Sequence, residues 1–294
     1  MTEDILDKWL DGEEIRRREK VLKRVSEVCA VPATAQRVMA VTTDDDADVK
    51  QISDAVSADP AIAAQLLKIA NSPLFAQSRQ IQDLRRAVVL IGRKELHSIA
   101  VAMAMMAAVQ SDQPLAKKLS STSVLSATFA RILATHVKAD GSLAFLGGLL
   151  CEIGALACLS VDGEGYSELY EKAAGSLEVL AEMEKGRYGL TSVEVGADML
   201  QRNLLPKPVI EAISLVPGSD LSETSMLQRI TLCARLVTPV IIDGAKNQDI
   251  ESIKVNCQII TESIGFEIDE DTLLEMAVTA ATAAELRLRG RAID

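Results

Sequence analysis

Histidine is scarce in this sequence, and catalysis by a chain of this kind would most plausibly need a metal or a histidine. Histidine is the most versatile general base and a common metal ligand, and the chain has two, His97 and His136. His97 lies in an apolar stretch, and His136 lies near the end of an expected helix, where an imidazole also interacts favourably with the helix dipole. We therefore predict that both histidines are structural.

The cysteines also lack the spacing of a metal or redox site. None belongs to a C-x-x-C pair, and their odd number argues against a disulfide framework. Cys151 and Cys158 are seven residues apart, which places both on one face of a helix, and we interpret them as buried thiols. The sequence also lacks a G-x-S-x-G elbow, a G-x-x-x-x-G-K-S/T phosphate loop and a G-x-G-x-x-G turn after a strand. These observations predict no catalytic residue, no metal and no cofactor.

The charge of the chain restricts its partners and its location. The net charge is -11, so the overall field repels phosphate backbones and anionic membrane surfaces, and we expect no nucleic-acid or membrane partner. One stretch, residues 16–24, is rich in arginine and lysine. Glutamates are interspersed with these cations, which favours a solvated, salt-bridged helix over a binding patch. The N-terminus is not a signal peptide and the apolar run at 99–109 is too short to cross a bilayer, so we expect a cytoplasmic protein.

Helices must position whatever site exists. Apolar residues recur with the 3.6-residue period of helices, and no sustained period-two alternation indicates a strand, so the predicted fold class is all-α. Asp59 followed by Pro60 is a strong helix start, Asp83 can cap another helix, and Gly92 can end it. The expected helices cover about 2–28, 33–41, 49–56, 60–71, 83–91, 94–110, 114–137, 143–159, 166–174, 177–187, 192–202, 206–215, 226–242, 250–264 and 272–289.

Three segments together resemble the HDOD family, the HD-related output domain. They read V-P-A-T-A-Q-R-V-M at 31–39, A-D-P-A-I-A-A-Q-L-L-K-I-A-N-S at 58–72 and I-Q-D-L-R-R-A-V-V-L-I-G at 81–92. The resemblance runs from about 31 to 216 and implies a compact multi-helix bundle of two lobes, the second similar to an HD phosphohydrolase. It assigns structural roles to the family-motif residues Asp59, Pro60, Leu66, Leu67, Asn71, Ser72 and Gly92.

The second lobe of an HD enzyme holds metal ions with histidines and aspartates, and the resemblance implies that these ligands are lost here. In S-T-S-V-L-S-A-T-F-A-R at 121–131, Thr122 stands at the position of the first histidine. In F-L-G-G-L-L-C-E-I-G at 145–154, Cys151 and Glu152 occupy the positions of the defining His-Asp pair, and in G-L-T-S-V-E-V-G at 189–196, Ser192 replaces a further histidine. Without these ligands a hard divalent cation is not held.

The resemblance therefore predicts a domain plan and a function. We expect an N-terminal helical extension at 1–28, an HDOD-like domain at 29–220 with lobes at about 29–113 and 114–220, and C-terminal helices at 221–294 packed on the HD-like lobe. The expected function is that of a non-catalytic bacterial signalling output module that binds unidentified signalling proteins or a small nucleotide-like ligand. The alternative is a divergent HD-type phosphohydrolase or nucleotide phosphodiesterase.

Overall fold

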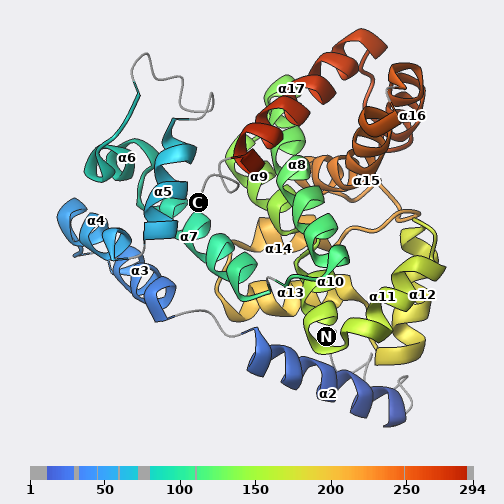
Figure 1. Cartoon of the computed structure of the whole chain (residues 1–294), viewed down its shortest axis with the longest axis horizontal. Coiled ribbons are helices and arrows are strands. Elements are labelled where there is room, and N and C mark those ends of the chain that lie inside the picture. The colour runs from blue at the N-terminus through green and yellow to red at the C-terminus, as the bar shows by residue number, and fades with distance from the viewer. Residues whose placement is uncertain are drawn as a thin grey trace. The chain divides into compact units, whose positions relative to one another are not determined.

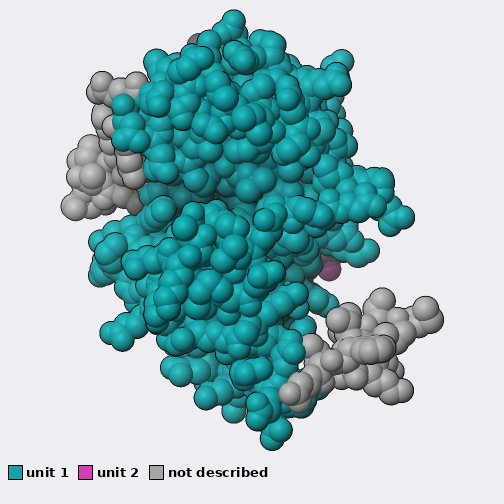
Figure 2. Space-filling view, turned by 90° about the vertical axis from the view of Figure 1, so that its right-hand side faces the viewer, with its two compact units in different colours: residues 1–29, 109–294 teal, residues 30–108 magenta. Residues whose placement is uncertain are grey.

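The computed structural model describes residues 12–29, 33–44, 46–58, 60–71, 80–109, 111–247 and 249–289. Every regular element in these ranges is an α-helix and none is a strand, which confirms the all-α fold class (Figure 1). The contacts divide the chain into two compact units (Figure 2). Unit 1 comprises residues 1–29 and 109–294, and unit 2 comprises residues 30–108.

Unit 2 is a small helical bundle whose helices begin and end at residues with clear capping roles. Asp83 accepts a hydrogen bond from the Arg85 backbone at the start of one helix, and Gly92, at a φ of 83°, ends it. The expected start at Pro60 is confirmed. Packing joins α3 to α7 and α4 to α6. The five helices are α3 (Ala33–Thr43), α4 (Val49–Ser57), α5 (Pro60–Ala70), α6 (Leu84–Ile91) and α7 (Arg93–Ala108).

One polar contact inside unit 2 accounts for the first of the two histidines. The ring of His97 on α7 lies 2.7 Å, from Nδ1 to Oγ1, from Thr42 on α3. Burial lowers the pKa of His97 below its ordinary value, a shift that a hydrogen bond with the Met39 backbone partly offsets. This half-buried imidazole therefore joins two helices of the bundle.

Unit 1 is built around the long helix α8, which packs against α9, α15 and α17 (Figure 1). The C-terminal helices thus belong to the same compact unit as the segment that resembles an HD phosphohydrolase. The helices of unit 1 are α2 (Gly12–Val28), α8 (Pro114–His136), α9 (Gly141–Leu150), α10 (Ile153–Val161), α11 (Gly163–Lys172), α12 (Leu177–Tyr188), α13 (Ser192–Arg202), α14 (Lys207–Ser214), α15 (Met226–Asn247), α16 (Ile250–Ser263) and α17 (Glu270–Arg289).

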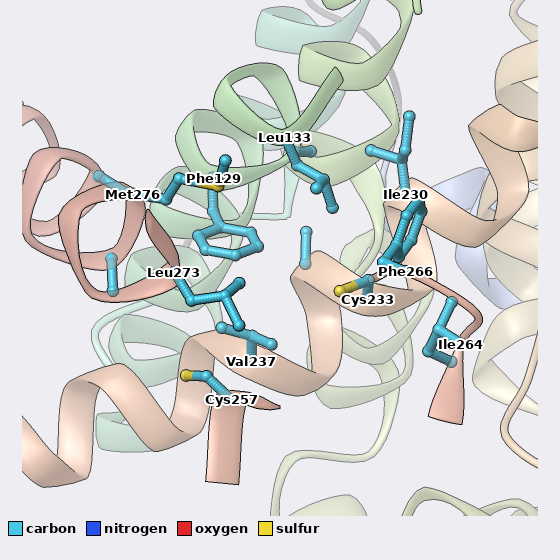
Figure 3. Close-up of a cluster of buried hydrophobic side chains, with 14 of the residues drawn as sticks. Phe129, Leu133, Ile230, Cys233, Val237, Cys257, Ile264, Phe266, Leu273 and Met276 are labelled. Carbon is cyan, nitrogen blue, oxygen red and sulfur yellow. The ribbon is translucent and has the colours of Figure 1, made fainter. Parts of the chain in front are cut away.

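A continuous hydrophobic cluster joins α8 to the three C-terminal helices. Figure 3 shows Leu273 and Met276 of α17 near the ring of Phe129 on α8, with Val237 of α15 and Cys257 of α16 in the same cluster. All five side chains are buried. Burial of apolar surface on this scale explains why α15 to α17 fold as part of unit 1.

The most apolar part of the chain differs from the expectation in two ways. The sequence predicts one helix at about 143–159, whereas the structure has two, α9 and α10, separated at Cys151 and Glu152. The single-helix prediction was wrong because Glu152 has φ and ψ of -106° and 9°, outside the regular helical range. The stretch Gly141–Val161 is also longer than the apolar run at 99–109 and meets the length and composition of a membrane span. Because 83% of it is buried inside the protein, core packing explains its composition.

The helix α2 lies along unit 1, against α10 and α12. Its apolar side is buried through Val21 and Val25. Gly189, at a φ of 76°, ends α12 in the left-handed region and lets the Glu14 carbonyl approach to a distance that a Cβ could not tolerate. The sequence predicts a helix from residue 2, and residues 1–11 of that prediction lie outside the described residues.

Candidate functional site

The candidate site is the centre of unit 1, where the sequence places the degenerate HD positions. Cys151 and Glu152 lie at the break between α9 and α10, and Ser192 is the first residue of α13. Two glycines bring these helices close together. A Cβ on Gly148 would lie 2.5 Å from the Ser126 carbonyl oxygen on α8, and a Cβ on Gly154 would overlap the Ser192 carbonyl oxygen. The structure therefore places Ser192 directly beside the start of α10.

Glu152 is bound by an arginine that the sequence analysis did not identify. Nε of Arg235, on α15, donates to Oε1 of Glu152 at 2.8 Å, and Nη2 donates to Oε2 at 3.1 Å. The two side chains are only 6% and 7% exposed. This is a bidentate guanidinium-carboxylate pair, the geometry in which both carboxylate oxygens are satisfied by one cation.

The charge balance of this pair is visible in the pKa of Arg235. Burial disfavours the guanidinium cation, but the adjacent Glu152 carboxylate more than offsets burial and raises the pKa of Arg235 above its ordinary value. The Arg235 guanidinium therefore remains a cation at neutral pH. Arg235 thus supplies the positive charge that lies beside the buried Glu152 carboxylate.

The neighbouring thiol, Cys151, is buried beside this carboxylate. Its Sγ donates to the Gly148 carbonyl at 3.1 Å. Burial, reinforced by the negative charge of Glu152, raises the pKa of Cys151 to about 12. Because metals bind the thiolate, this protonated thiol is a poor ligand.

The remaining two degenerate positions, Thr122 and Ser192, form hydrogen bonds with residues other than Glu152. The Thr122 hydroxyl donates to the Lys118 carbonyl one turn earlier in α8, at 3.0 Å. The Ser192 backbone N–H donates to Oε2 of Glu184 at 2.7 Å. Among the described residues, the Thr122 side chain forms no hydrogen bond with the other three positions.

A second buried carboxylate, Glu184, completes the polar interior of this region. It is 1% exposed and accepts hydrogen bonds from the Tyr166 hydroxyl at 2.7 Å and from the Ser192 backbone. Burial raises the pKa of Glu184, and these hydrogen bonds partly offset the shift. Burial also raises the pKa of Tyr166 well above its usual value, so the phenol remains a donor.

The residues at this centre do not fit a divalent metal ion. One carboxylate is fully engaged by a guanidinium, the thiol is protonated, and the two hydroxyl positions carry no imidazole. Within the described ranges, no group of three or more His, Cys, Asp or Glu side chains is placed to hold a metal. The Arg235–Glu152 pair binds the break between α9 and α10 to α15.

The sequence contained a signal for the residues that the analysis missed. Arg235 is the single charge in the apolar run from Ile230 to Ile242, and Glu152 is the single charge in the run from Leu143 to Leu159. A lone charge in each of two buried helices predicts that they pair, because an isolated buried charge is too costly to retain. No comparable signal marked Glu184, which lies among other charged residues of α12.

The family-motif residues lie in unit 2 and have structural roles where they are described. Pro60 begins α5, Leu66 is buried and Leu67 is half-buried. The Asn71 side chain donates to the Ile81 carbonyl and accepts from the Ile81 N–H, which joins the two ends of the segment between α5 and α6. Asp59 and Ser72 lie outside the described residues.

Comparison with known proteins places this geometry in context. An uncharacterized protein of Treponema pallidum (strain Nichols) is 26% identical over 205 residues, which cover 66% of this chain and 38% of that protein. This chain thus spans well under half the length of that relative. A crystal structure from Shewanella amazonensis SB2B, provisionally named a phosphohydrolase, matches with a TM-score of 0.68 at 22% identity, over 90% of this chain and 95% of that one.

Other comparisons agree on the fold and on the family. A provisionally named signal transduction protein from Marinobacter aquaeolei VT8 matches with a TM-score of 0.60 at 18% identity, over 93% of this chain and 64% of that one. These likenesses confirm the HD-phosphohydrolase-like helical fold. The family model of the HDOD domain matches residues 28–216. The chain therefore belongs to the HDOD domain family.

Proposed function

We propose that the protein is a non-catalytic output module of a bacterial signal-transduction pathway. The observation that carries this proposal is the bidentate Arg235–Glu152 pair at the position of the defining HD residues. An HD enzyme uses that carboxylate to hold the metal that lowers the pKa of an attacking water. Here the carboxylate accepts two hydrogen bonds from the Arg235 guanidinium, which cannot activate water.

The proposal extends to partners and location. With water activation removed, a packed scaffold can still transmit a signal by binding signalling proteins, or by binding a small nucleotide-like ligand that shifts the helix packing between two arrangements. The signal-transduction name of the Marinobacter aquaeolei VT8 protein supports this class. The net charge of -11 supports a cytoplasmic module with no nucleic-acid or membrane partner.

Metal analysis combined with phosphatase assays tests the proposal. The full chain, purified in the presence of Mn²⁺ or Mg²⁺, is examined for bound metal and for hydrolysis of p-nitrophenyl phosphate, nucleotides and cyclic dinucleotides. We expect less than stoichiometric metal and no turnover above that of a matched blank. The variant Glu152→Gln and the exposed control Glu171→Gln should be equally inactive.

The opposite result would support the alternative, a divergent HD-type phosphohydrolase. That reading requires a stoichiometric metal and a turnover that Glu152→Gln abolishes and Glu171→Gln preserves. Circular dichroism of each variant separates a lost activity from a lost fold.

A further inference from the structure

The outward side of α16 carries two apolar side chains one helical turn apart. Val255 and Ile259 are 44% and 59% exposed, whereas Ile253 and Cys257 of the same helix are buried in the hydrophobic cluster of Figure 3. Val255 lies two residues before Cys257 and Ile259 two residues after it, so both point away from the buried side of the helix. Figure 1 shows α16 at the upper right edge of unit 1.

Neither core packing nor helix formation accounts for valine and isoleucine at these two positions. Both side chains are β-branched, and such residues lose side-chain freedom in a helix and have a lower helix propensity than alanine. Surface positions of a helix, where packing does not decide, are better filled by strong helix formers. Burial against another molecule would stabilise these side chains, which are largely exposed in this chain.

Carboxylates border the two apolar side chains. Glu251 precedes Val255 by four residues and Glu262 follows Ile259 by three, so all four lie along one side of α16. Both glutamates are exposed. Within the described part of the chain, neither has a cation within 4.0 Å. We name these four residues the α16 docking face.

The surroundings of the α16 docking face are strongly acidic. Residues 249–282 contain eight aspartates and glutamates, all exposed, and one cation, Lys254. Lys254 lies on the Glu251 side of α16, but its ammonium forms an ion pair with Asp271 of α17 at 3.0 Å. The segment therefore keeps a net charge of -7, the larger part of the -11 of the whole chain.

This charge and the apolar pair together select the occupant. A negative field repels a phosphate backbone, an anionic lipid surface and the same acidic face of a second copy, and it attracts a basic partner. Free metal ions and polyamines have no apolar side chains to cover Val255 and Ile259. A protein segment that combines basic and apolar residues is complementary to both features.

We propose that the α16 docking face binds a basic amphipathic helix of a partner protein. From residue 251 to residue 262 the face is about 17 Å long, the length of about three turns of a partner helix. Its side chains follow a row of residues three and four apart, which is the kind of ridge that packs into the groove of a second helix. Arginines or lysines beside the partner's apolar seam would pair with Glu251 and Glu262.

This inference deepens the proposed role as a protein-binding output module and rests on that role. The helix α16 packs on α15, which carries Arg235, so the occupant would contact the neighbour of the helix that binds Glu152. Helix docking requires neither a metal ion nor turnover. Detection of turnover would therefore refute the non-catalytic function, while the docking face is judged by its own binding measurement.

Fluorescence anisotropy with a labelled basic amphipathic peptide tests the docking face in the full chain. The probe is an alanine-rich helix of about 14 residues, with leucines every three or four residues and arginines beside them. One control peptide has glutamate in place of each arginine, and a second has alanine in place of each leucine. We expect the probe to bind saturably and either control peptide to bind at least about tenfold more weakly.

Two double variants test the apolar and the acidic parts of the face. Val255→Ala with Ile259→Ala should weaken probe binding on the order of tenfold, since it removes apolar contact area. The Tm should not fall by more than about 2 °C, because alanine is the stronger helix former at an exposed position. Glu251→Gln with Glu262→Gln should weaken binding by about three- to tenfold, since it removes two exposed ion pairs.

A matched double variant separates a local surface from net charge. Glu178→Gln with Glu182→Gln removes the same charge from exposed positions on α12, beside the exposed Val179, and should change binding less than about twofold. Equal weakening by the two glutamate variants would overturn the proposal. Absence of saturable binding, equal binding of the glutamate control peptide, or sedimentation showing that Val255 and Ile259 mediate self-association would also overturn it.

Discussion

Removal of either partner of the Arg235–Glu152 pair should destabilise the protein far more than removal of both. In Glu152→Leu, the guanidinium of Arg235 remains about 6% exposed with no carboxylate to accept its two hydrogen bonds. In Arg235→Met, the Glu152 carboxylate is left in the same environment. The double variant replaces the pair with two apolar side chains of similar volume and leaves no buried charge.

The burial of the pair sets the size of the effect. Breaking a buried ion pair by removing one partner costs about 3–5 kcal/mol, whereas replacement of both partners by apolar residues is often neutral or stabilising. For a unit of this size, each kcal/mol lowers the Tm by about 2–4 °C, so each single variant should lose roughly 10 °C. The double variant should unfold within a few degrees of the parent protein.

Urea titration followed by circular dichroism measures the three free energies of unfolding and closes the double-mutant cycle. With single losses of about 3–5 kcal/mol each and little loss in the double variant, the buried-pair reasoning predicts a coupling energy of about 6 kcal/mol or more between the two sites. Single variants that lose less than about 1 kcal/mol would show that the two groups are solvated and would refute it. So would a double variant whose loss equals the sum of the single losses, because additivity means that the groups do not interact.

Three further measurements test other parts of unit 1. Gly154→Ala should lower the free energy of unfolding by about 1–3 kcal/mol because the new Cβ overlaps the Ser192 carbonyl, whereas Gly186→Ala, in open space on α12, should raise it by about 0.5–1 kcal/mol. Burial raises the folded-state pKa of Glu184 above its ordinary value near 4.5, so the folded protein binds this proton more tightly than the unfolded chain. Stability contributed by the protonated form is therefore lost as pH rises through the folded-state pKa, and Glu184→Gln should flatten that decline in urea titrations across the same pH range. The five cysteines are free and buried, so Ellman's reagent should modify them in urea and leave them unmodified in the native protein; rapid native reaction would contradict the burial.

Local signals in the sequence predicted most of the helices and their boundaries. Asp83 and Gly92 delimit α6 as expected, because capping depends on a few adjacent residues and their backbone angles. The 3.6-residue period of apolar residues predicted the helical class because it too depends on residues that are close in the sequence. Caps and periodicity therefore could be read without knowledge of the tertiary contacts.

The site required information that periodicity does not contain. The break between α9 and α10 interrupts a run of apolar residues, so no change of pattern marks it, and Glu152 pairs with a residue 83 positions later. The charges of α2 show the same limit. The interspersed glutamates and cations predicted a solvated, salt-bridged helix, and most of these side chains are exposed, but the spacing of charges within α2 did not identify Glu194 of α13 as the partner of Arg18.

The position of Arg235 explains how the HDOD domain of this chain is completed. The family model ends at residue 216, yet the cation that satisfies the Glu152 carboxylate comes from α15, beyond that limit. A metal ion would be bound from solution and exchange with it, whereas a guanidinium on a packed helix is fixed by the chain. A movement that takes α15 away from the break between α9 and α10 separates two buried charges, which costs several kcal/mol. The C-terminal helices are in this way energetically coupled to the centre of the HD-like fold.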